Sequence, residues 1–215
     1  MNSKTIKKKA LIYLKYRDQE IDPALDALIE DCIQEAVDAS SFRAMSVILP
    51  LKHDPLSIDQ ISVALPYPSL EKLFQDCDRI MIVACTLGQE MDRKLRYYGK
   101  FDMTRLTILD SVCNAYLEEA CDDYEKERIH EKRTFRYAPG YGDVPIALNE
   151  VFMQYLNTAK GIGLTVQETG MLLPQKSMVG MIGIGERKTK KTCNRCLMEN
   201  DCEYRKKGLT CYTQD

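Results

Sequence analysis

One short segment combines a side chain and a turn that suit the binding of a polar ligand: Arg136-Tyr137-Ala138-Pro139-Gly140-Tyr141. A guanidinium can bind a carboxylate through two parallel hydrogen bonds. The Pro-Gly pair ends any regular element, and the turn it predicts exposes backbone amides beside the arginine. The segment therefore predicts a ligand-binding loop, and a surface loop with a tyrosine packed onto it is the alternative.

A second set of candidate ligands is formed by the cysteines near the C-terminus. Thiolates at this spacing, a C-x2-C pair with two more cysteines nearby, suit zinc or an iron–sulfur cluster. The tail from residue 186 onward has too few large apolar residues to build a core, so a metal would supply its folding energy. We predict a metal site at Cys193, Cys196, Cys202 and Cys211, with zinc and a [4Fe-4S] cluster both open, and four reduced thiols as the alternative.

The other cysteines lie on apolar patterns and are predicted to be core residues: Cys32, Cys77, Cys85, Cys113 and Cys121. The total of nine is odd, and no secretory signal precedes them, so a disulfide framework is not expected.

Several function classes are not indicated. The two histidines, His53 and His130, read as surface residues, and the sequence contains no G-x-S-x-G, H-E-x-x-H or phosphate-binding glycine loop. A net charge of −2 argues against nucleic acid as a partner. No apolar run approaches the length of a membrane span, and the basic N-terminus lacks a signal-peptide core. We expect a soluble, cytoplasmic protein.

The periodicities predict helices and strands in mixed order, hence an α+β fold with a mixed or antiparallel twisted sheet and flanking helices. The expected helices are 4–16, one beginning at Pro23, 69–74, 88–98, 104–131 and 145–158, the last ended by Gly161 and Gly163. The expected strands are 42–51, 60–65, 80–85, 164–171 and 177–185, the last two paired in a hairpin-like return. Glycines in the last strand leave room for a close approach: Gly180, Gly183 and Gly185.

The longest helix, 104–131, carries an apolar stripe from Leu109 to Tyr124 with a polar rib beside it. Asp110, Asn114 and Glu118 follow one another at i, i+4 and i+8, so they share a face. The rib could line a cleft, or it could be a solvated flank of the helix.

In this order, the segments resemble the activation domain of vitamin B12-dependent methionine synthase. Its Arg-x-x-x-Gly-Tyr signature is met by Arg136, Gly140 and Tyr141, and a helix, a Gly-Leu-Thr strand at 163–165 and a Leu-Pro-x-x-Ser turn at 173–177 follow. The match covers residues 109–185, within an expected domain of residues 1–185. The cysteine-rich tail, residues 186–215, lies outside the family's domain.

The resemblance implies a site for S-adenosylmethionine without catalytic side chains. Arg136 would bind a polar end of the ligand, and the backbone at Tyr137 and Ala138 would meet its adenine or amino-acid part. Gly140 would allow the close approach, and Tyr141 would pack beside it. The family's acidic ligand-binding residue is matched by Asn114, on the helix that also carries Asp110. Because Asn114 is an amide, it could hydrogen-bond the ligand without a negative charge, so that affinity would be lower or the ionic contact would fall to Asp110 or Glu118.

The function implied is a methyltransferase-associated reactivation factor. It would support reductive methylation of the cobalamin of a separate methionine synthase or related corrinoid methyltransferase, in methionine biosynthesis, with a reductant protein as a possible further partner. Two alternatives stay open. One is a docking or electron-delivery module for a corrinoid protein, without methyl transfer of its own. The other is a zinc-stabilised interaction protein.

Overall fold

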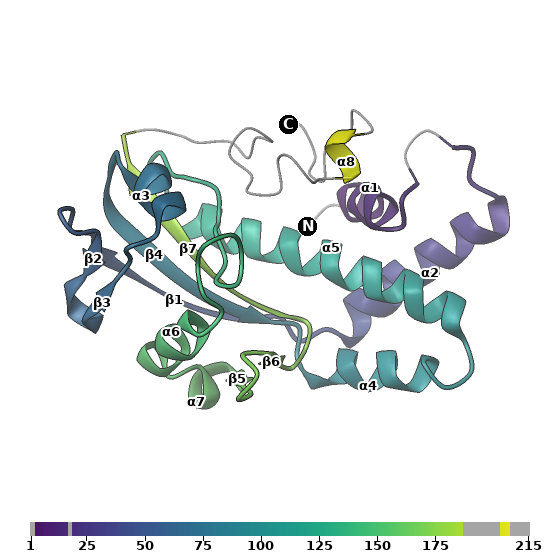
Figure 1. The fold of residues 1–215 in the computed structure, drawn as a ribbon. Helices are drawn as coiled ribbons and strands as arrows, with labels where there is room; N and C mark the ends of the chain where they lie inside the picture. The colour runs from purple at the N-terminus through teal and green to yellow at the C-terminus, as the bar shows by residue number, and fades with distance from the viewer. Residues whose placement is uncertain (1–2, 17–18, 187–202, 207–215) are drawn as a thin grey trace. The chain divides into compact units, whose positions relative to one another are not determined.

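The structure, a computed structural model, describes residues 3–16, 19–186 and 203–206 (Figure 1). Helices and strands follow one another in mixed order, which confirms the α+β fold class. The chain forms two compact units, each made of three stretches. Unit 1 comprises Met1–Ala44, Cys85–Glu127 and Ile162–Met178, and unit 2 comprises Met45–Ala84, Arg128–Gly161 and Val179–Asp215.

Unit 1 is mainly helical. It contains α1 (Ser3–Tyr13), α2 (Pro23–Ala39), α4 (Gln89–Tyr98) and nearly all of α5 (Met103–Arg128). The Asp22 carboxylate caps α2 by accepting the Ala24 N–H at 2.8 Å, and Pro23 occupies the first turn. The apolar stripe predicted on α5 is buried at Leu109, Val112, Cys113, Tyr116, Leu117, Ala120 and Cys121.

Three strands form one sheet in the order β1-β4-β7: β1 (Arg43–Pro50), β4 (Cys77–Thr86) and β7 (Ser177–Gly185). Backbone bonds at both ends of each pair show that neighbours run antiparallel. β1 and β4 are joined by Ser41 to Leu87 and by Leu51 to Asp78, while β4 and β7 are joined by Leu87 to Lys176 and by Glu186 to Asp76. The central strand, β4, is buried continuously from Ile80 to Thr86, as the predicted buried strand requires.

The remaining short elements of unit 2 precede and follow β4. β2 (Ser57–Ile58) and β3 (Val63–Ala64) pair antiparallel around the 3-10 turn η1 (Asp59–Ile61). They are followed by α3 (Pro68–Phe74), and α6 (Leu148–Leu156) lies later in the chain. α7 (Thr158–Ile162) begins in unit 2 and ends at the first residue of a unit 1 stretch, and α8 is Glu203–Lys206.

Two predicted strands are wrong. The segment 60–65 contains part of the 3-10 turn and the two residues of β3, because Ser62 turns the chain in a left-handed conformation. The segment 164–171 contains only β5 (Thr165–Val166), which pairs with β6 (Leu172–Leu173) and not with β7. The chain reverses between them, where the Gly170 N–H donates to the Gln167 carbonyl at 2.8 Å and Gly170 has φ +81°.

The helix predicted at 145–158 is observed as α6, but the predicted cause of its end is wrong. α6 ends at Leu156, and its C-cap, Asn157, adopts the left-handed conformation with φ 53°. Gly161 lies inside α7 and serves packing, since the Met45 sulfur occupies the space that a Cβ would fill.

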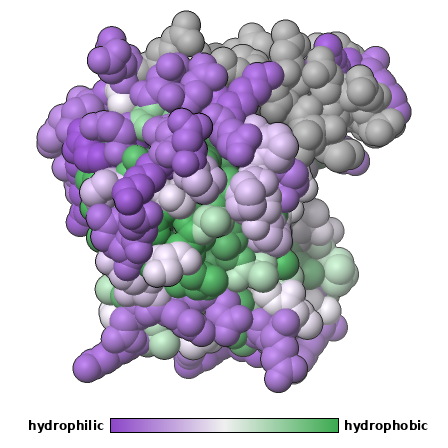
Figure 2. All heavy atoms as spheres, turned by 60° about the vertical axis from the view of Figure 1, so that its left-hand side comes forward, coloured by the Kyte–Doolittle hydropathy of each residue, from purple (hydrophilic) through white to green (hydrophobic). Residues whose placement is uncertain are grey.

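The surface of one face is mostly hydrophilic, and Figure 2 shows hydrophobic side chains gathered near its centre. Within unit 2, Ile48, Ile146 and Tyr155 are exposed apolar residues. Among the described helices, none combines the length and the apolar character that crossing a bilayer needs.

Candidate functional site

The predicted ligand-binding residues fall into two groups, one in each unit. Asp110 and Asn114 lie on α5 in unit 1, and the segment from Arg136 to Tyr141 lies in unit 2. Each group is built by neighbours within its own unit. That the two groups line one site stays a prediction.

The segment before the loop lies along β7 and makes two isolated antiparallel bridges to it, Arg133 with Ile184 and Tyr137 with Met181. The N–H of Tyr137 donates to the Met181 carbonyl and the N–H of Met181 donates back to Tyr137, both at 2.8 Å. The Thr134 N–H donates to the Gly183 carbonyl at 2.8 Å, and the Gly183 N–H donates to Thr134 Oγ1 at 2.9 Å. This pairing fixes the base of the loop to the part of β7 that lies in unit 2.

The side chain of Arg136 packs into space that Gly180 of β7 leaves open because it has no side chain. A Cβ at Gly180 would lie 2.5 Å from Arg136 Cγ and 2.7 Å from Cδ, so the aliphatic part of Arg136 crosses the strand where Gly180 leaves space. The space beside the two other glycines of β7 is occupied by different groups. Gly183 faces Cys77 Sγ and Phe74, and Gly185 faces the backbone of residues 76–77. The close approach predicted for these glycines is thus made by the chain's own groups.

The loop itself holds an exposed aromatic ring and one backbone N–H that no other described residue binds. Gly140 has φ +90°, a conformation that disfavours any side chain, and its amide donates to the Val144 carbonyl at 2.9 Å. The Tyr137 hydroxyl donates to the Tyr141 carbonyl at 3.2 Å. Tyr141 is 70% exposed, and the Ala138 N–H makes no hydrogen bond to another described residue. Because both backbone groups of Tyr137 bind Met181, the backbone contact predicted for a ligand depends on Ala138.

The polar rib of α5 binds a lysine of its own unit. Lys176 Nζ lies 2.7 Å from Asp110 Oδ1 and donates to Asn114 Oδ1 at 2.7 Å. The lysine side chain is only 9% exposed, whereas that of Asp110 is 48% exposed. Asn114 Nδ2 also donates to Asp110 Oδ2 at 3.3 Å, and Glu118 accepts from the Tyr13 hydroxyl at 2.8 Å. The predicted ligand-binding side chains of α5, Asp110 and Asn114, are therefore already bound to the ammonium group of Lys176.

The predicted Leu-Pro-x-x-Ser turn holds this lysine in place. The Gln175 N–H donates to Asp92 Oδ2 at 2.8 Å, and Ser177 Oγ donates to the Pro174 carbonyl at 2.6 Å. Lys176 lies between these two anchored residues. Sequence reasoning assigned the turn correctly and did not identify its lysine as a partner of the rib.

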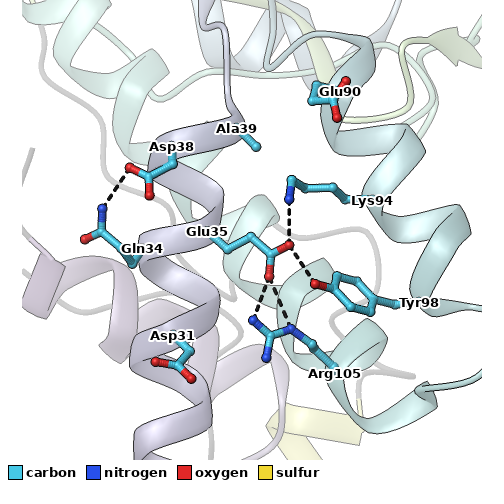
Figure 3. A pocket seen from close by; sticks show the side chains of 9 residues that line it. All are labelled: Asp31, Gln34, Glu35, Asp38, Ala39, Glu90, Lys94, Tyr98 and Arg105. Atoms are coloured by element: carbon cyan, nitrogen blue, oxygen red, sulfur yellow. Dashed lines mark hydrogen bonds and ion pairs between the residues drawn. The ribbon is translucent and has the colours of Figure 1, made fainter.

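A groove of about 630 Å³ lies elsewhere in unit 1 and was not predicted. Figure 3 shows side chains from α4 and α5 converging on Glu35 of α2. The Glu35 carboxylate accepts hydrogen bonds from Lys94 Nζ and the Tyr98 hydroxyl at 2.9 Å each and from Arg105 Nη2 at 2.8 Å. Because these partners satisfy Glu35, we assign this Glu35 cluster a structural role.

The charge of Glu35 makes stability depend on pH. Burial opposes its ionisation, but the hydrogen bonds from Lys94, Arg105 and Tyr98 prevail and hold the pKa of Glu35 below its ordinary value of 4.5. A lowered folded-state pKa stabilises the protein above about pH 4.5, and this stabilisation is lost as the pH falls through the folded-state pKa.

We expect Glu35→Gln to lower the free energy of unfolding by about 1–2 kcal/mol at pH 7, because hydrogen bonds to a charge become weaker ones. Below pH 4.5 the difference from wild type should shrink. Urea unfolding between pH 3 and 7 measures the difference in free energy of unfolding. The control is Asp31→Asn, because the Asp31 carboxylate lies on the same groove and is exposed. A difference that stays constant over this range contradicts the assignment.

The five scattered cysteines are buried and form no disulfide within the described residues, which confirms their predicted place in the core. Burial raises the pKa of the Cys77 thiol to about 11 and that of Cys113 to about 12, so both stay protonated at neutral pH. The predicted metal ligands, Cys193, Cys196, Cys202 and Cys211, lie outside the described residues. Within the described residues, no group of three or more His, Cys, Asp or Glu side chains could hold a metal ion.

A comparison with solved structures finds a crystal structure of the MetH reactivation domain bound to AdoHcy. The two folds superpose with a TM-score of 0.63 at 15% sequence identity, over 97% of this chain and 83% of that one. No protein-family model and no curated protein matches the sequence. At this identity the likeness shows the fold, so the expected activation-domain-like fold is confirmed.

Proposed function

We propose that this protein binds S-adenosylmethionine and acts as a reactivation factor for a corrinoid methyltransferase, most directly a cobalamin-dependent methionine synthase. One observation carries the proposal: the chain shares its fold, over 97% of its length, with a reactivation domain described as bound to AdoHcy. The 136–141 loop supports it, because the loop holds a guanidinium, an exposed ring and the Ala138 N–H, which no other described residue binds.

Four residues of the loop have a role in this proposal. The Arg136 guanidinium, carried on a stem fixed over Gly180, binds the carboxylate end of the ligand. The Ala138 N–H, which no other described residue binds, donates to a polar atom of the amino-acid or adenine part. Gly140 keeps the loop narrow, and its nearest side-chain neighbour is Ile146 at 3.5 Å from the position of a Cβ. Tyr141 covers one side of the ligand.

The proposed reaction needs no general base on this chain. S-adenosylmethionine would supply an activated methyl group to the cobalt of the partner's corrin, once a reductant protein has reduced that cobalt to cobalt(I), and would leave as S-adenosylhomocysteine. The protein then contributes the orientation of the ligand and the exclusion of water from it. This is consistent with a loop that contains donors and an aromatic ring but no histidine.

A second candidate function is favoured by Lys176. This buried ammonium balances the charge of Asp110, so α5 offers little net negative charge to the sulfonium of S-adenosylmethionine. A docking or electron-delivery module without methyl transfer of its own would need no such charge. Calorimetry with S-adenosylmethionine distinguishes the two functions, because only the first requires binding.

We expect the wild-type protein to bind S-adenosylmethionine and Arg136→Ala to bind it at least about tenfold more weakly, since a hydrogen-bonded charge pair is lost. Arg79→Ala is the matched control, because Arg79 lies in the same unit and pairs with Glu131 on the surface. Full-strength binding by Arg136→Ala would show that the loop is not the site. No binding by the wild type favours the docking module.

The cysteine-rich tail belongs to the same proposal as a metal site, with zinc or a [4Fe-4S] cluster as its occupant. Iron and sulfide assays on anaerobically purified protein separate the two metals. A cluster supports electron delivery to the cobalt, whereas zinc alone removes electron delivery from the proposal. Absence of both metals means that the four cysteines are ordinary thiols.

A further inference from the structure

The turn between α4 and α5 exposes three large apolar side chains within seven residues. Tyr97 is 60% exposed, and Phe101 and Met103 are each 61% exposed. Among the described large hydrophobic residues only Tyr141 is more exposed. Single exposed apolar residues are common on protein surfaces, but a cluster of this kind marks a contact surface. We call Arg96, Tyr97, Lys100, Phe101 and Met103 the α4–α5 tip.

The rings of the tip are packed before any partner binds. The ring centroids of Tyr97 and Phe101 lie 4.5 Å apart at an interplanar angle of 83°, an edge-to-face arrangement. The backbone of the turn is closed by bonds from the Asp102 N–H to the Tyr98 carbonyl at 2.8 Å and from the Lys100 N–H to the Tyr97 carbonyl at 3.1 Å. A surface that is already ordered loses little conformational entropy on binding.

The Glu35 cluster anchors both ends of this turn. Tyr98, beside Tyr97 in the sequence, donates its hydroxyl to Glu35, and Arg105 binds the same carboxylate (Figure 3). Asp102 Oδ1 accepts the Arg105 N–H at 2.9 Å and so caps the start of α5. The polar side chains Tyr98, Asp102 and Arg105 thus form hydrogen bonds within unit 1, while Tyr97 and Phe101 remain exposed.

The tip carries two basic side chains, and the one carboxylate of the same turn, Asp102, is used to cap α5. Arg96 and Lys100 are exposed and form no salt bridge with any described carboxylate. Arg96 Nε donates only to the backbone carbonyl of Asp92, at 3.2 Å. By contrast, Arg93 one turn earlier pairs with Glu90 at 2.8 Å. Charge complementarity therefore favours an acidic partner surface.

We propose that the α4–α5 tip is the surface through which this protein docks onto an acidic face of its corrinoid partner. This inference rests on the proposed function for the identity of the partner. Tyrosine, phenylalanine, methionine and arginine are the residue types enriched in protein–protein interfaces, and rigid aromatic anchors commonly dominate their affinity. An anionic membrane is less well matched, because the tip offers only two unbalanced cations.

The test compares four double or single variants of the full chain. Tyr97→Ser with Phe101→Ser removes the rings, and Arg96→Glu with Lys100→Glu reverses the charge. Tyr155→Ser and Lys8→Glu are the matched controls, since both positions are exposed and lie outside the tip. The probe is the isolated cobalamin-binding domain of a cobalamin-dependent methionine synthase, and S-adenosylmethionine binding is measured on the same samples.

We expect both tip variants to bind the probe at least about tenfold more weakly than the wild type, with S-adenosylmethionine binding unchanged and the controls unaffected. Tip variants that bind like the wild type, or a wild type that does not bind the probe, overturn the docking inference. Tip-dependent binding to vesicles of anionic lipid in place of the probe also overturns it. Tip-dependent docking without S-adenosylmethionine binding would instead overturn only the proposed function.

Discussion

Gly180→Ala is expected to weaken S-adenosylmethionine binding about as much as removal of Arg136, on the order of tenfold or more. A methyl group at Gly180 would lie 2.5 Å from Arg136 Cγ, so the arginine stem must leave the strand and its guanidinium must move with it. The strand itself tolerates alanine, because the backbone of Gly180 is not in the left-handed region. Calorimetry with S-adenosylmethionine measures the loss.

The double variant distinguishes displacement of Arg136 from a general disturbance of β7. In Arg136→Ala the space above Gly180 is empty, so adding Gly180→Ala should cause no further loss of binding. Additive losses would contradict the proposal that Gly180 acts through Arg136. Unchanged binding in Gly180→Ala would mean that the position of Arg136 is irrelevant to the ligand.

Gly183→Ala is expected to act on stability instead, lowering the free energy of unfolding by about 2 kcal/mol. The new methyl group would lie 2.5 Å from Cys77 Sγ and 2.6 Å from Phe74 Cδ1, and all three residues are buried. A buried thiol and a fully buried ring cannot move aside as an arginine stem can. Urea unfolding of the purified protein measures the effect.

Gly180→Ala is the matched control for this prediction, because it makes the same change three residues earlier in the same strand. It should cost clearly less stability than Gly183→Ala. Cys77→Ala in the Gly183→Ala background should recover part of the lost stability by opening space. Equal stability of wild type and Gly183→Ala would mean that the core around Phe74 is loosely packed.

The elements of this fold that depend on local sequence signals were predictable. Asp22 and Pro23 mark the start of α2, and the continuous apolar run Ile80–Cys85 marks a buried strand. The spacing of apolar residues on α5 identifies its buried face. In each case the residues that determine the structure are near neighbours in the chain.

Contacts between distant segments could not be predicted from spacing. The glycines of β7 indicate space, but only the fold shows that Arg136 fills one of these spaces and Cys77 another. The pairing of Lys176 with Asp110 joins residues 66 positions apart, and no local pattern signals it. The strand predicted at 164–171 was too long and β6 was missed, because strands of two residues are too short to produce a periodicity.

A crystal structure of the chain grown with AdoHcy tests the central claim most directly. The account predicts ligand density at the 136–141 loop, with a carboxylate on Arg136 and a polar atom within hydrogen-bond distance of the Ala138 N–H. The same density would show whether Asp110 and Asn114 line the site. Density in the groove beside Glu35, or a loop without ligand at saturating AdoHcy, would contradict the account.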